Sequence, residues 1–147
     1  MADHVRKQIR DAVETALTGL ATTGATVFTS RVYPIEADSL PCLAILTATE
    51  TIALDEGTLE APHRLLTVEV RGIAKATSAL DDTLDTIAKE VEVAMRADIT
   101  LGGLSAGLDL SSTEMELTAE GDQPHGQVSL FYIIQYRTPF GDPTTVS

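Results

Sequence analysis

Few side chains in this sequence have the types and spacing that chemistry requires. The acids Asp81, Asp82 and Asp85 could bind a metal ion, but they fall where a predicted helix begins. Acidic residues at that end of a helix are typical of compensation for the helix dipole. A second, weaker candidate cation site consists of Glu120, Asp122 and His125. Weak cation binding by this second group is a minor alternative, and we predict no metal site.

Residues that often act in catalysis are also far apart in the sequence. His4, His63 and His125 have no nearby partner in the sequence, and each is typical of a surface histidine. The glycine-rich stretch LGGLSAG, residues 101–107, lacks the Lys-Ser/Thr ending of a phosphate-binding loop and indicates a connector. No set of nucleophile, base and orienting group can be assembled. We therefore predict that the protein is not an enzyme and has no cofactor.

The composition and net charge of the chain argue against some classes of binding partner. The chain has 147 residues, of which 44% are hydrophobic, as expected for one folded domain. Its net charge is −12, which disfavours binding to nucleic acid and to anionic membranes. Cys42 is the single cysteine and lies in an apolar run, where a buried thiol is expected. No secretory signal or membrane-spanning run is apparent, so we expect a soluble protein made in a cytoplasm.

The elements that would position any site follow from hydrophobic periodicity. Asp3 is the expected N-cap of a helix whose apolar positions run from Val5 to Leu20, and Ser78 with Asp81 forms a capping-box-like start to a second helix. Strands are expected at 25–33, 42–51, 64–75, 108–119 (with a bulge near 111–113) and 126–137.

The order α-β-β-β-α-β-β predicts one α+β domain, residues 1–147. Its sheet should be mostly antiparallel or mixed, with about four to five strands and both helices packed on one face. We also expect an extended loop at about 49–64 and a flexible C-terminal tail at about 139–147.

The last strand is apolar on both faces, which raises the question of what covers it. Val128, Leu130, Tyr132, Ile134 and Tyr136 alternate with Phe131 and Ile133. Two helices can cover one face, which leaves the second face open. We expect the uncovered apolar residues to be Phe131, Ile133, Leu43, Ile45 and Leu65. The cover is then a second copy of the chain or, alternatively, the 49–64 hairpin folded back.

Three segments resemble a known protein family. They are RVYPIEADSLPCLAIL (31–46), HRLLTVEVRGIA (63–74) and the ending YIIQYRTPFGDP (132–143). Together with the helix that precedes them, they resemble the tail terminator proteins of long, non-contractile phage tails, also called minor tail protein U-like. The resemblance spans nearly the whole chain.

This resemblance implies a virion protein of α+β fold that assembles as a hexameric ring at the head-proximal end of the tail. Such a ring ends the growth of the tail tube and offers the surface on which the head docks. Its implied partners are copies of itself, the tail tube protein and the head–tail connector proteins. DNA passes through the ring without specific binding, and the family has no catalytic residues to transfer.

Two other interpretations stay open. One is another head–tail joining or tail-completion ring protein, and the other is a small-molecule-binding regulatory α+β domain. For the ring interpretation, Arg137 is expected to pair with a carboxylate of the next subunit, with Asp142 as an intrachain alternative and a solvated strand end as a third reading. The full set of candidate subunit or tube contacts is Phe131, Ile133, Arg137, Asp142, Asp55, Glu56 and Glu60.

Overall fold

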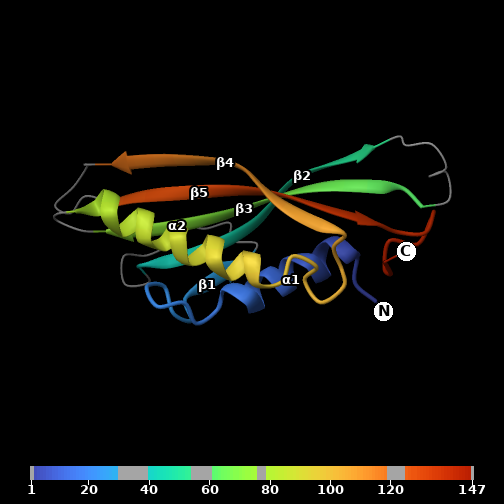
Figure 1. The fold of residues 1–147 in the computed structure, drawn as a ribbon, viewed down its shortest axis with the longest axis horizontal. Helices are drawn as coiled ribbons and strands as arrows, with labels where there is room; N and C mark the ends of the chain where they lie inside the picture. The colour runs from blue at the N-terminus through green and yellow to red at the C-terminus, as the bar shows by residue number, and fades with distance from the viewer. Residues whose placement is uncertain (1, 30–39, 54–60, 76–78, 119–124, 147) are drawn as a thin grey trace.

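The fold is a twisted five-stranded sheet with two helices on one side (Figure 1). The computed structural model describes residues 2–29, 40–53, 61–75, 79–118 and 125–146. Its elements are α1 (Val5–Leu17), β1 (Val27–Thr29), β2 (Cys42–Ala53), β3 (His63–Lys75), α2 (Leu80–Ala97), β4 (Gly107–Thr118) and β5 (His125–Arg137). This order and the mixed sheet confirm the predicted α+β class.

The sheet has the order β1-β2-β3-β5-β4. The short strand β1 runs parallel to β2, whereas the other neighbours are antiparallel. At the centre, β3 and β5 pair without interruption from His63 opposite Arg137 to Lys75 opposite His125. The pairing of β4 with β5 shifts between Leu110 and Ser112, which confirms the bulge expected from the change of apolar phase.

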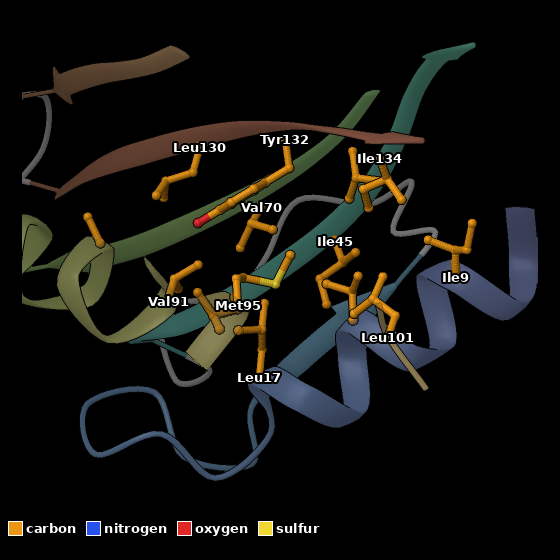
Figure 2. Packing of buried hydrophobic residues seen from close by; sticks show 14 of the residues in the cluster. Ile9, Leu17, Ile45, Val70, Val91, Met95, Leu101, Leu130, Tyr132 and Ile134 are labelled. Atoms are coloured by element: carbon orange, nitrogen blue, oxygen red, sulfur yellow. The ribbon is translucent and has the colours of Figure 1, made fainter. Parts of the chain in front are cut away.

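Both helices cover the same face of the sheet, where the core lies (Figure 2). Alternate residues of β5, from Val128 to Tyr136, are buried against them, as the period-two pattern predicts. The prediction for β2 was wrong in part. Leu43 and Ile45 are fully buried in the core, because their partners Gly72 and Val70 also face the helices. Leu43 and Ile45 therefore belong to the helix-covered face, while Cys42 and Ala44 of the same run lie on the opposite row and are also buried.

The helix ends also differ from expectation. His4, not Asp3, is the N-cap of α1, since its Nδ1 accepts a 3.0 Å hydrogen bond from the Arg6 N–H. The helix ends at Leu17 rather than Leu20. At α2 the N-cap is Ala79, which has no side chain to cap with, and Ser78 lies outside the described residues.

Gly72 allows α2 to approach β3 closely. A Cβ atom added there would lie 2.6 Å from Ile87 Cγ2 and 3.3 Å from Val128 Cγ1. Both neighbours are buried core side chains with little freedom to move. A residue without a side chain is therefore required at this point of the helix–sheet contact.

We expect Gly72→Ala to destabilise the protein by about 1–3 kcal/mol, the usual cost of forcing extra atoms into a packed core. Gly107→Ala is the matched control, because a Cβ atom there meets nothing within 4 Å. Urea unfolding of the two variants measures the difference. Equal midpoints would show that α2 can shift to make room.

Candidate assembly surfaces

The face of the sheet opposite the helices, here called the open face, carries half-buried apolar residues. Phe131 and Ile133 lie on it, as predicted, and Leu65 and Leu46 lie near them on β3 and β2. Their partial exposure contrasts with the full burial of their neighbours on the helix side.

A fixed polar cluster lies among these apolar side chains. The Glu69 carboxylate accepts hydrogen bonds of 2.9 Å from both Arg71 Nε and Ser129 Oγ. Glu69 stands directly opposite Phe131 in the pairing of β3 with β5. The open face therefore combines apolar contact area with an oriented ion pair, a combination typical of protein interfaces rather than of a monomer core.

Two of the other predicted contact residues, Arg137 and Asp142, lie after the apolar part of β5 and make hydrogen bonds within the chain. Arg137 ends β5 on the open-face row, and its Nη1 donates a 3.2 Å hydrogen bond to the Ala61 carbonyl. Asp142 lies in the C-terminal tail, where its carboxylate accepts hydrogen bonds from the Thr144 N–H and hydroxyl; these bonds lower the pKa of Asp142. Asp55, Glu56 and Glu60 lie outside the described residues, as do Glu120 and Asp122.

A buried carboxylate, Glu50, joins four elements on the helix side of the sheet. Its Oε2 accepts 2.9 Å hydrogen bonds from Arg6 Nη1 of α1 and Arg64 Nη1 of β3. Its Oε1 accepts a hydrogen bond from the Tyr136 hydroxyl of β5. The Glu50 side chain is only 8% exposed. Burial, followed by the hydrogen bond to Glu50, raises the pKa of Tyr136.

The C-terminal tail is fastened beside this cluster. Thr138 is fully buried, and its hydroxyl accepts a 3.1 Å hydrogen bond from Arg64 Nε. Farther along, the Pro143 carbonyl accepts a 2.7 Å hydrogen bond from the Val5 N–H at the start of α1. The last residues of the chain thus hold the first helix, and the two termini lie near one another in Figure 1.

The edge strand β4 is the most exposed apolar element of the described chain. Its residues Leu110, Met115 and Leu117 are 38%, 51% and 54% exposed, although they lie on the helix side of the sheet. In the sequence, the alternation of Met115 and Leu117 with Glu114 and Glu116 predicts that the two apolar side chains are buried, and the structure contradicts that prediction. The reason is that α2 packs under β3 and β5, so β4 projects beyond its cover.

A groove of about 270 Å³ lies between the end of α2 and the start of β4. Met95, Ile99, Leu108 and Tyr132 are among its lining residues. Burial, with a smaller contribution from the charge of Glu92, raises the pKa of Tyr132 to about 12. Figure 2 shows Tyr132 projecting from β5 into the core.

Sequence reasoning missed the Glu50 cluster and the exposure of β4. Glu50 reads as one acid of a polar loop, but a bulge between Thr47 and Thr49 reverses the phase of β2 and turns Glu50 inward. The available signal was the alternation of LTATETIA, which continues past the expected end of the strand. The exposure of β4 depends on where α2 packs, and the sequence pattern does not contain that information.

Two further observations concern chemistry and membranes. Within the described residues, no group of three or more His, Cys, Asp or Glu side chains is arranged to hold a metal ion. The helices of that same part of the chain are not long and apolar enough to cross a membrane.

Comparison with known proteins finds likeness in structure but not in sequence. No family model matches the sequence, and no curated protein matches it. Among solved structures, the chain is similar to a chain of the "Virion of native gene transfer agent (GTA) particle". The two share 16% sequence identity with a TM-score of 0.40, over 90% of this chain and 92% of that chain. A likeness of this degree does not transfer a function to this protein.

We expect Glu50→Ala to destabilise the protein by about 3–5 kcal/mol, because it leaves the partly buried Arg64 guanidinium without its counter-ion. Asp11→Ala is the control, because Asp11 pairs with Lys7 on the exposed side of α1, where an ion pair contributes little. Chemical unfolding distinguishes the two. A loss from Glu50→Ala no larger than that of the control would contradict the role of Glu50 as the link between elements.

The raised pKa of Tyr132 predicts a loss of stability in alkaline solution. Between its usual value of 10.0 and about 12, the unfolded tyrosine releases its proton while the folded one keeps it. The contribution of Tyr132 is therefore complete below about pH 10 and declines above it, by at most about 1.4 kcal/mol per pH unit. Unfolding free energies from pH 9 to 11.5 should fall less steeply for Tyr132→Phe. Parallel slopes would show that this tyrosine ionises equally in both states.

Proposed function

We propose that this protein is a structural virion protein that forms a ring on the end of a phage tail tube. The ring ends tube polymerisation and provides the surface on which the head docks. A homo-hexamer is the proposed assembly, with the tail tube protein on one side and head–tail connector proteins on the other. DNA passes through without specific binding, and no chemical reaction is involved.

The open face is the observation that carries this proposal. Both helices lie on one side of the sheet, and Phe131, Ile133 and Leu65 remain half-buried on the other. Apolar side chains on a sheet face without a helix layer offer a surface that another protein chain can cover. We propose that a neighbouring copy covers it and that Arg137, at the exit of β5, pairs with a carboxylate of that copy.

The segments behind the family resemblance support the same proposal, because they have structural roles in this fold. The ending YRTPFGDP supplies Tyr136 to the Glu50 cluster, the buried Thr138 and the carbonyl of Pro143 that holds α1. The middle segment is β3, the central strand that supplies Arg64. The residues of these two segments that carry the resemblance are thus residues that fix the framework of the fold.

The charge of the protein suits a passage for DNA. A chain of net charge −12 offers few cations to phosphate groups, and several of its arginines are already paired with carboxylates, among them Arg6, Arg64 and Arg71. A ring of such subunits would not hold the DNA that must move through it.

The proposed function predicts a defined defect in particles made without this protein. A tube end presents the same surface to the next tube ring and to the terminator, so a tube without its terminator continues to grow by head-to-tail addition. Electron microscopy of a lysate from a deletion strain should show abnormally long tails without properly joined heads. Tails of normal length that merely lack heads would favour a head–tail joining protein, and an absence of tails would contradict both.

A point variant separates assembly from folding in the same assay. Arg137→Glu reverses a charge at the exit of β5 and should yield a mixture of normal and overlong tails. Its melting temperature should fall less than that of Glu50→Ala, because Arg137 lies at the end of its strand and bonds to the Ala61 carbonyl rather than to the buried Glu50 cluster. Normal tails with a normal melting temperature would remove Arg137 from the proposed contact.

A further inference from the structure

We propose that neighbouring subunits join through their sheet edges. In this contact β4 of one copy pairs with the outer half of β2, Leu46–Ala53, of the next copy, so that the sheet continues across the boundary. The inference rests on the proposed ring and names the surfaces that build it. It uses the exposed residues of these two edges and not Phe131, Ile133 or Leu65 of the open face.

The first edge is β4. It is a 12-residue strand at the end of the sheet order, with β5 as its neighbour on one side. Natural edge strands are usually short or protected by charged side chains, proline or a bulge. β4 has a bulge between Leu110 and Ser112 and acids on its open-face row, but beyond the bulge it is regular from Ser112 to Thr118, and its helix-side residues Met115 and Leu117 stay exposed. Such an edge is a template for another strand.

The second edge is the outer half of β2. The strand β1 pairs with Leu43, Ala44 and Ile45, and among the described residues no strand pairs with Leu46–Ala53 on that side. Thr49 and Thr51 are exposed there on the open-face row. On the helix-side row Ile52 is 46% exposed. This edge is neutral at its surface, because the acid it contains, Glu50, points into the buried cluster.

Charge selects the unlike pairing over the like one. The exposed acids of β4, Asp109, Glu114 and Glu116, all lie on the open-face row. Two β4 strands paired edge to edge would bring these rows together, and like charges opposite one another are destabilising. Against β2 the same acids meet Thr49 and Thr51, while Met115 and Leu117 meet Ile52. The neutral edge is therefore the better partner.

The strand directions allow this contact to repeat around a ring. Three antiparallel steps separate β2 from β4, so the two strands run in opposite directions within one subunit. Rotation about an axis along the strands keeps each strand's direction and keeps the helices on one side. It brings β4 beside an antiparallel β2 of the next copy. A contact between two different surfaces is heterologous and closes into a ring when the rotation permits.

Two variants that each block one edge test the inference. Met115→Lys with Leu117→Lys places charge on the apolar row of β4, and Thr49→Glu with Thr51→Glu places acids opposite those of β4. Each variant alone should fail to form the rings that the parent protein forms, with subunit affinity lowered about tenfold or more. An equimolar mixture should form a heterodimer and stop there, since one intact edge of each kind remains. Native mass spectrometry resolves these species.

The controls keep the outcomes distinct. Val93→Lys and Thr86→Glu introduce single charges of the same two signs at exposed positions of α2 and should leave rings intact. Circular dichroism confirms that every variant is folded.

If the parent forms rings and both edge variants still do, the edge contact is wrong and the proposed function stands. If the variant Thr49→Glu with Thr51→Glu, which keeps β4 intact, associates with itself, the contact is a pairing of two β4 edges instead. A parent protein that stays monomeric, even with tail tubes present, would overturn the ring and this contact together.

Discussion

The buried carboxylate of Glu50 is the constraint on which the rest of this fold depends. It receives hydrogen bonds from α1, β3 and β5, and it belongs to β2 itself. A charge in this position is tolerable only when its partners stay in place, because an unpaired buried charge is strongly unfavourable. The cluster therefore fixes where the first helix lies against the sheet, and the C-terminal tail is fastened to the same place through Arg64 and Thr138.

The position of α1 in turn determines which parts of the sheet are covered. The first helix packs on β1 and β2, and the second packs on β3 and β5. Two helices are too few for the underside of five strands, so β4 is left projecting. The apolar residues at that edge are exposed because two helices cannot cover all five strands. Poor packing is not the cause, since the core beneath β3 and β5 is fully buried. In the proposed assembly, other chains would cover what the helices leave exposed.

The sequence predicted the class, the order of elements and the phase of the central strands, because periodicity is a local signal. It also predicted the bulge of β4 from a change of apolar phase between Leu110 and Met115. It failed where the answer depended on contacts between distant elements. Leu43 and Ile45 face the helices because of their register with Val70 and Gly72, and Glu50 turns inward because of a bulge in β2. Met115 and Leu117 look like core residues in the sequence, and only the placement of α2 leaves them exposed.

The net charge of the protein limits the kinds of interaction that can join copies of the chain. Copies of a chain with net charge −12 repel one another at distances up to the screening length, which is about 10 Å at 0.1 M salt. Long-range attraction therefore cannot bring subunits together, and any stable contact must come from short-range, directional interactions. Backbone hydrogen bonds along a strand edge and a row of apolar side chains are interactions of that kind. A protein whose net charge repels other copies, but whose sheet edges can pair, would stay monomeric at low concentration. It would assemble where copies are held close together, as they would be at the end of a tube.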